Sequence, residues 1–405
     1  MRRITHWRIS VSTASAMRAY KGHPFFSIGL RPFFLLSAIW AGVSVPIWLA
    51  AFSHGGAIDL SWHVHEMLFG YTGGVIVGFL MTAVPNWTGR MPVVGAPLAA
   101  MTVLWTVGRL AMLAGAVSPD FTPRIWLSSI DILFLMAMAA MVWREVVVGR
   151  NWRNVPVAVM VSVLALSNVG FHLEVGLTGL APVSTRIALS VVAMMIALIG
   201  GRTTPSFTRN WQLKRGGPLP ALPDRLDQAV LVLTLVALVS WNVSPESSWA
   251  GSLLAAAGLF NLLRLARWKG YATLAEPLVL ILHMGYFWLA CGLGLIGLAV
   301  LAPSVIPQSA GIHALTAGGI GVMTLAVMTR ASRGHTGRPL TAGAAGVIIY
   351  LMINVAALLR VTGGIWLDAH MPFLIASGTC WSAAFLAFAL AYGGMLIGPR
   401  PASQR

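Results

Sequence analysis

Two histidines and a glutamate stand at the start of a long apolar segment, in the stretch WHVHEMLFG at 62–70, as His63, His65 and Glu66. Imidazole nitrogen is a good ligand for copper and for haem iron. A neighbouring carboxylate can orient such an imidazole or relay a proton. Ionisable side chains inside a membrane-spanning segment are costly and usually mark a functional site. The stretch therefore predicts metal or proton chemistry at this position.

The elements that must position these residues are membrane-spanning helices. Only 9% of the 405 residues are charged and 57% are hydrophobic, whereas a soluble domain has about 25% charged residues. Alternation of period two is absent, which argues against a transmembrane barrel. The chain is predicted to be an all-α polytopic membrane protein with about twelve transmembrane helices. The predicted spans are 32–52, 62–85, 96–117, 123–143, 154–176, 184–201, 226–245, 248–266, 276–301, 309–331, 341–362 and 371–396.

The distribution of basic residues predicts the orientation of these helices. With twelve spans, all but four of the 27 lysines and arginines fall on the side of the N-terminal tail. By the positive-inside rule both termini are predicted to be cytoplasmic. The net charge of +16 therefore reflects topology, and no nucleic-acid partner is expected. The predicted organisation is a basic tail at 1–29, a single transmembrane domain at 30–398 and a short tail at 399–405, with membrane lipid as a partner. The longest connection, about 202–225, is predicted to be a surface loop.

Three different helices bring histidine to a similar predicted depth, near the periplasmic side. His63 and His65 begin the second span, and His313 lies in the first turns of the tenth. His172 lies near the outer end of the fifth span and shares a helix face with Asn168. These four histidines are the predicted metal ligands.

Helical spacing separates the two histidines of the opening stretch. His63 and Glu66 are predicted to share a face with a stripe of glycines, while His65 points to the opposite side. His63 and His65 are therefore not expected to bind one metal ion together unless the backbone at 62–65 is irregular. The glycine stripe comprises Gly70, Gly74 and Gly78.

Other polar residues have both a functional and an ordinary interpretation. Glu66 is a candidate for orienting a ligand imidazole through a hydrogen bond, or for relaying a proton. Arg109 could neutralise a haem propionate, or simply pair with Glu174 or Glu66. His335 lies in a basic cytoplasmic cluster that is either an anionic binding site, for propionates or lipid phosphates, or a consequence of the positive-inside rule. For isolated histidines such as His54 the ordinary interpretation, a hydrogen-bonded residue near a helix end, is preferred.

Four long stretches resemble the NnrS family of bacterial membrane proteins. The stretches are LRPFFLLSAIW at 30–40, WHVHEMLFGYTGGVIVGFLMTAVPNWTGR at 62–90, GGRTTPSFTRNW at 200–211 and HALTAGGIGVMTLAVMTRASRGHTGRPL at 313–340. The resemblance implies a twelve-helix protein of the bacterial inner membrane that contains haem and copper and is linked to nitric oxide metabolism and nitrosative-stress resistance. His172 lies outside these stretches, so its assignment rests on depth alone.

Three hypotheses for function follow. The first is a haem- and copper-binding protein that binds nitric oxide or a related small ligand, with an unknown electron donor and with catalysis left open. The second is a proton-coupled transporter without a redox cofactor. The third is a signalling or metal-delivery protein that binds the cofactors without turnover.

Overall fold

The computed structural model describes residues 20–88, 92–118, 124–366 and 370–401, and these residues form helices and connections without a strand. Twelve helices are long and apolar enough to cross a membrane, which confirms the predicted all-α membrane architecture. The helices are η1 (Pro24–Phe26), α2 (Leu30–His54), α3 (Leu60–His65), η2 (Glu66–Thr72), α4 (Gly73–Thr88), α5 (Ala96–Val117), α6 (Arg124–Val148), η3 (Trp152–Asn154), α7 (Val155–Thr178), α8 (Pro182–Met195), η4 (Ile196–Gly200), α9 (Gly201–Leu213), α10 (Arg225–Val243), α11 (Ser248–Ala266), η5 (Gly270–Thr273), α12 (Pro277–Leu301), α13 (Gln308–His313), η6 (Ala314–Ile320), α14 (Gly321–His335), α15 (Gly343–Ile365) and α16 (His370–Ile397).

Local sequence signals define where several spans begin and end. The carboxylate of Asp59 accepts a hydrogen bond from the Trp62 amide (2.8 Å) and so caps α3. Asp224 and Asp227 form a capping box at the start of α10. Gly55 follows α2 in the left-handed conformation, with φ of 66°, which glycine adopts without steric cost.

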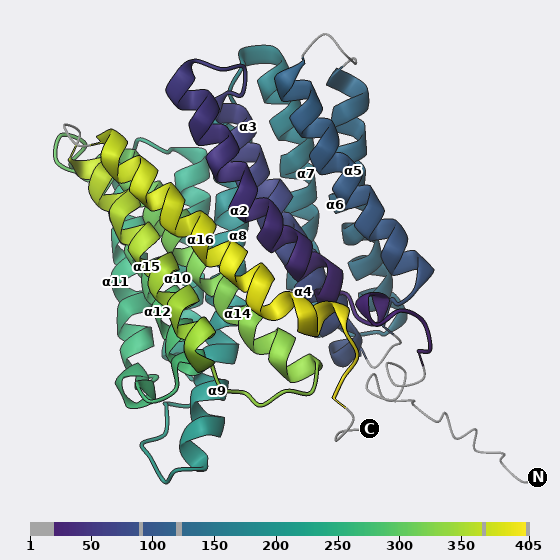
Figure 1. The fold of residues 1–405 in the computed structure, drawn as a ribbon. Helices are drawn as coiled ribbons and strands as arrows, with labels where there is room; N and C mark the ends of the chain where they lie inside the picture. Colours follow the sequence, from purple (N-terminus) through teal and green to yellow (C-terminus); the bar gives the residue numbers. More distant parts are fainter. Residues whose placement is uncertain (1–19, 89–91, 119–123, 367–369, 402–405) are drawn as a thin grey trace, which may run out of the picture.

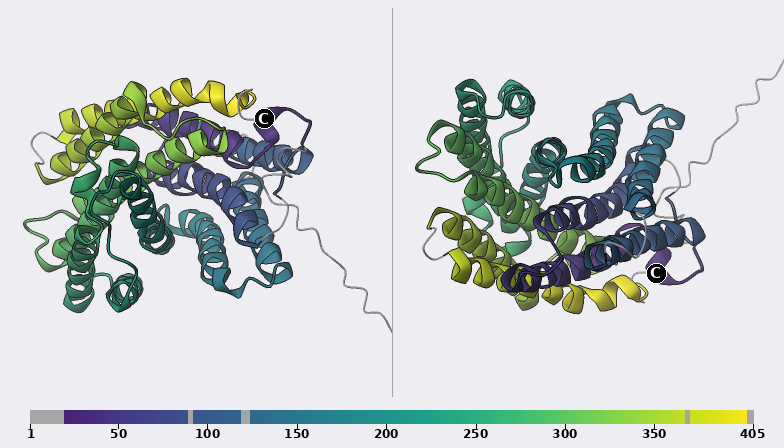
Figure 2. Two further views of the ribbon diagram at one scale, coloured as in Figure 1. Left: turned by 90° about the horizontal axis from the view of Figure 1, so that it is seen from below. Right: turned by 90° about the horizontal axis from the view of Figure 1, so that it is seen from above.

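The spans that carry the histidines of the opening stretch and of the tenth helix lie at the centre of the bundle. In the most apolar stretch of each span, the largest shares of buried residues are found in Leu60–Pro85 (78%) and Gln308–His335 (67%). Figure 1 shows α5, α6 and α7 on one side and α10, α11 and α12 on the other, and the two end-on views of Figure 2 keep these groups apart. Polar side chains on the central spans are thus surrounded by protein rather than lipid.

The first and last spans pack side by side and are joined by an arginine. In Figure 1, α2 and α16 cross the bundle together, and the described chain starts and finishes at the same end. The buried guanidinium of Arg31 donates to the carbonyls of Leu396 (3.0 Å) and Gly398 (2.7 Å) at the end of α16. Helix-terminal carbonyls lack partners within their own helix. The arginine of the LRPFF stretch therefore has a structural role.

Three spans contain a short π-helical segment: η2, η4 and η6. A π-helical turn holds one more residue than an α-helical turn, so it rotates the following side chains around the axis, and such segments are frequent at functional sites. The freed carbonyl of Ala197 in η4 accepts from the guanidinium of Arg264 (3.0 Å), which also pairs with Asp227 (2.7 Å). These segments change which residues share a face.

The predicted surface loop at about 202–225 is wrong in its first half. The sixth span continues without a break from Pro182 to Leu213, through α8, η4 and α9. Thr208 of α9 is fully buried and bonds to His283 of α12 (2.8 Å). Because α9 packs against α12, its polar sequence remains helical, and the irregular connection covers only 214–224.

Candidate functional site

A cluster of ionisable and amide side chains lies inside the bundle between α3, η2, α5, α6 and α7. We call it the polar cluster, and its members are His65, Glu66, Arg109, Asp131, Asn168 and His172. The first five are buried, with exposed fractions of 0–2%, and His172 is half-buried. Burying charged groups inside a membrane span costs free energy, and pairing between the members of the cluster offsets that cost.

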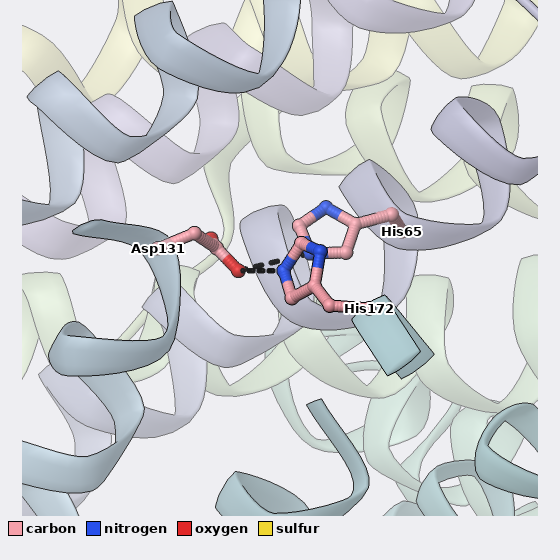
Figure 3. A group of neighbouring side chains, drawn as sticks. All are labelled: His65, Asp131 and His172. Carbon is pink, nitrogen blue, oxygen red and sulfur yellow. Dashed lines mark hydrogen bonds and ion pairs between the residues drawn. The ribbon is translucent and has the colours of Figure 1, made fainter. Parts of the chain in front are cut away.

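Asp131 is the acceptor at the centre of the polar cluster. Its Oδ2 accepts from Nδ2 of Asn168 (2.8 Å) and lies 3.0 Å from Nε2 of both His65 and His172. Its Oδ1 accepts from the guanidinium of Arg109. Figure 3 shows both imidazoles directed at the same carboxylate oxygen. One acid from α6 thereby joins side chains from three other helices.

Both ring nitrogens of His65 face carboxylates. Nδ1 lies 2.8 Å from Oε1 of Glu66, and Nε2 lies 3.0 Å from Oδ2 of Asp131. An ionised carboxylate can only accept, so both contacts are hydrogen bonds when His65 carries a proton on each nitrogen. In that state two positive groups, His65 and Arg109, balance two negative groups, Glu66 and Asp131.

Aromatic residues and a glycine shape the space around the polar cluster. Trp40 of α2 donates through Nε1 to Oε2 of Glu66 (2.6 Å), which also accepts from Arg109 (2.7 Å). The rings of Phe69 and Phe171 lie 5.4 and 5.3 Å from the His65 ring. A Cβ at Gly70 would overlap the guanidinium of Arg109, so glycine is needed there. The cluster is therefore enclosed on its inner side.

Three members of the polar cluster could hold a metal ion. One ligand atom each from His65, Asp131 and His172 lies within 4.8 Å of the other two (Figure 3). Two imidazoles and a carboxylate form a mixed nitrogen and oxygen donor set that suits copper or zinc. Metal binding requires that a ligand nitrogen give up its proton. The same atoms can therefore hold either a proton or a metal ion.

A separate cavity of about 310 Å³ lies beside the polar cluster and contains the other two predicted histidine ligands. We call it cavity 1. His63, from α3, and His313, from α13, both line it, and Arg360 of α15 contributes a guanidinium. The remaining walls are mostly apolar and include Trp48, which stacks on the His63 ring with 4.2 Å between centroids.

The histidines of cavity 1 have unused nitrogen atoms. Nδ1 of His313 is 2.7 Å from the carbonyl of Ser309 and must donate to it, which leaves the Nε2 lone pair free. Nδ1 of His63 is buried without a hydrogen-bond partner. Arg360 forms neither an ion pair nor a hydrogen bond with the described part of the chain. Cavity 1 thus offers imidazole nitrogen and a positive charge to a ligand.

The structure divides the predicted site residues between different places. His65 and His172 meet in the polar cluster, while His63 and His313 line cavity 1. The predicted separation of His63 from His65 is found. Glu66 lies in the polar cluster, where it accepts from Arg109, whereas His63 lines cavity 1. A Cβ at Gly70 would lie 2.7 Å from Oε2 of Glu66, so Glu66 and Gly70 are on the same side of the helix.

The remaining predicted residues are also located. Arg109 pairs with Glu66 and Asp131, and Glu174 instead accepts from the Val183 and Ser184 amides (3.0 and 2.8 Å) at the start of α8. His335 lies far along α14, in a second cavity. His54 is exposed and bonds to the Ala50 carbonyl (2.8 Å), as the ordinary interpretation expects.

Two residues of the site were not selected from the sequence. Asp131 is an acid in the middle of one apolar span and Arg360 is the base of another, and such residues are rare enough there to have been candidates. Their roles depend on which helices are neighbours, since Asp131 meets residues 66 positions before and 41 positions after it.

A comparison with protein families identifies the chain. Residues 24–400 match the family described as NnrS protein. The chain belongs to the NnrS family. No curated protein matches it. Membership of NnrS covers nearly the whole transmembrane bundle and supports a nitric-oxide-related role for this multi-pass membrane protein.

Proposed function

We propose that this NnrS protein binds copper in the polar cluster and haem in cavity 1, and acts on nitric oxide or a related small ligand in the bacterial inner membrane. The observation that carries the proposal is the meeting of His65, Asp131 and His172 within 4.8 Å inside an apolar bundle. Nitric oxide is small and neutral, so it can reach both places through the membrane.

Charge balance supports copper in the polar cluster. With both nitrogens of His65 protonated, the positive and negative groups cancel. A monovalent copper ion that replaces the His65 Nε2 proton leaves the net charge unchanged. Buried charges without compensation are strongly unfavourable, so exchange of a proton for Cu⁺ is the balanced way to load this site.

The donor set of cavity 1 suits haem. Haem iron needs one or two axial nitrogens and an apolar slot, and His63 and His313 offer nitrogen atoms with no protein partner. Arg360 would pair with a propionate. The sequence suggested this role for Arg109, but Arg109 pairs with Glu66 and Asp131 instead. The volume of about 310 Å³ lies at the lower end of the range for ligand pockets. When bound, haem supplies an iron that binds nitric oxide. His63, His313 and Arg360 would orient it, and the apolar walls would exclude water.

The side of the membrane follows from the positive-inside rule. Basic residues gather at the end of the bundle that holds both termini, so that end is proposed to be cytoplasmic. His63, His65, His172 and His313 lie toward the opposite end and would be reached from the periplasmic half. The electron donor is not specified by these residues.

Metal analysis and optical spectra of single variants test the proposal. We expect H65A and H172A to lose copper and keep haem absorption, and H63A and H313A to lose or shift haem absorption and keep copper. H54A is the matched control, because His54 is exposed and contacts only a helix carbonyl. Full copper and haem content in all four variants would contradict both site assignments.

The position of His65 between two carboxylates also favours a second candidate, a proton-coupled transporter. A histidine between two buried carboxylates is a proton-binding site with or without a metal. Proton-driven substrate uptake by proteoliposomes that contain the protein without haem or copper would favour this alternative.

A further inference from the structure

A second cavity, of about 470 Å³, lies between α4, α8, η4, α9, α12 and α14. We call it cavity 2. Thr72 and Ile320 line both cavities, so a single layer of residues separates them. The side chains of Tyr71 and Thr324 hydrogen-bond across this layer. Cavity 2 is therefore a distinct space on the side of the bundle nearer the termini.

Most of cavity 2 is apolar, but one end carries two nitrogen-bearing side chains from α14. These are the guanidinium of Arg330 and the imidazole of His335, both half-buried. The opposite walls consist of aliphatic and aromatic residues, such as Val75, Phe79 and Leu282. A ligand that fills this space needs a polar head at one end and an apolar body.

Arg330 has no acceptor within the described protein. It forms no hydrogen bond or ion pair with residues in the described ranges, and its guanidinium lies 3.9 Å from the centroid of the Phe207 ring. The carboxylate of Glu276 is used instead to cap α12 through the Leu278 amide (3.1 Å). A guanidinium offers five N–H donors and no acceptor, and a cation–π contact satisfies none of them. His335 likewise makes no side-chain hydrogen bond among the described residues.

The charged residues that line cavity 2 are basic, and Glu276 acts on Arg330 electrostatically from outside the lining without forming an ion pair. No aspartate or glutamate is among its lining residues in the described chain, whereas Arg330 is fully charged and His335 can donate. An arginine that serves only membrane topology can place its guanidinium in water. The placement of Arg330 inside an apolar cavity calls for a negatively charged oxygen from a ligand.

We propose that cavity 2 binds an anionic amphiphile, with its carboxylate or phosphate at Arg330 and His335 and its acyl chain along the apolar walls. This ligand is additional to the proposed haem and copper. A filled cavity 2 would keep water away from the layer of Tyr71 and Thr324 beneath cavity 1. The head chemistry is shared by fatty acids and by anionic phospholipids, and the experiment distinguishes them.

Photolabelling of the full-length protein tests the proposal. The probe is a diazirine-bearing C16 fatty acid, used with protein in nanodiscs of phosphatidylcholine, and labelled peptides are located by mass spectrometry. We expect labels on α4, α9 or α14 at cavity 2. Oleate should compete at least about tenfold better than oleyl alcohol, because a charge-assisted hydrogen bond is lost with the alcohol. Competition by oleate alone indicates a carboxylate ligand, and competition by phosphatidylglycerol as well indicates that a phosphate head also binds.

Three variants separate this site from surface charge and from haem. R330Q should remove the preference for oleate over oleyl alcohol, and A331F should block labelling by filling the cavity without changing charge. R202Q is the matched control, because Arg202 is exposed on the neighbouring α9, and it should behave as wild type. Equal competition by oleate and oleyl alcohol in the wild type, or labels only outside cavity 2, would overturn the proposal. Absence of labelling in the wild type would overturn it as well, and loss of haem absorption in R330Q would assign cavity 2 to haem instead. The histidine variants above test haem and copper independently of this result.

Discussion

Replacement of Glu66 by glutamine changes the number of protons that the polar cluster holds. In the charge balance proposed above for the wild type, Glu66 and Asp131 offset Arg109 and a His65 that carries a proton on each ring nitrogen. In E66Q one negative charge is gone, so the balanced state has a neutral His65 beside the pair of Arg109 and Asp131. The amide oxygen of glutamine can still accept from Trp40 and Arg109, which preserves the packing.

The expected magnitude follows from this charge count. Cu⁺ binding to the wild type should release one proton, from Nε2 of His65, and leave the net charge at zero. In E66Q no proton is available to leave, so bound Cu⁺ adds an uncompensated charge. An uncompensated buried charge costs about 3–5 kcal/mol, which corresponds to about 150- to 4,000-fold weaker copper binding.

Proton release and affinity can be measured on the same purified protein. Cu⁺ is titrated into weakly buffered protein at pH 7 with a pH indicator, and the dissociation constant is obtained by competition with a chromophoric Cu⁺ chelator. E174Q is the control, because Glu174 contacts the start of α8 rather than the polar cluster. It should release one proton and bind copper as the wild type does. Wild-type protein that binds copper without releasing a proton, or E66Q with unchanged affinity, would refute the charge balance.

Three further predictions concern the stability of the folded bundle. R264M should lower the free energy of unfolding by about 3–5 kcal/mol, because it leaves buried Asp227 without its closest cation. A thermal melt in detergent measures this loss, and the double variant R264M/D227L, which also removes the acid, should lose less stability. G297V should destabilise the bundle by about 1–3 kcal/mol or more, since even a Cβ at Gly297 would lie 2.5 Å from the Ala255 amide nitrogen of α11; an unchanged melting temperature would contradict this packing. Arg267 lowers the pKa of the exposed Asp224 carboxyl. The pair therefore contributes stability that is fully present above the ordinary carboxyl pKa and is lost as the pH falls below it, and D224N should flatten this acid part of the stability profile, measured by melts at decreasing pH.

The twelve spans could be predicted because apolar length is a local property of the sequence. The histidine positions along each span followed from the same count. The separation of His63 from His65 was also predictable, since the regular helix α3 begins at Leu60, before both residues.

Other features depend on contacts that no local pattern records. The surroundings of Glu66 depend on Arg109 and Trp40 from neighbouring helices and on His65 from its own span. The helix α9 was predicted as a loop since its sequence is polar, and only its packing against α12 keeps it helical. Asp131 was visible as a lone acid, but its four partners come from three other helices.

The bond between Arg31 and the last turn of α16 has a consequence for biosynthesis. Arg31 leaves the ribosome about 365 residues before the carbonyls that it binds, so co-translational insertion cannot complete the first span. Closure of the bundle is then a post-insertion event, and a chain truncated before α16 would leave a buried guanidinium exposed to lipid. Because the start of α2 and the end of α16 meet at this contact, a circular permutant that links these two helix ends and opens an exposed connection elsewhere should retain the bundle.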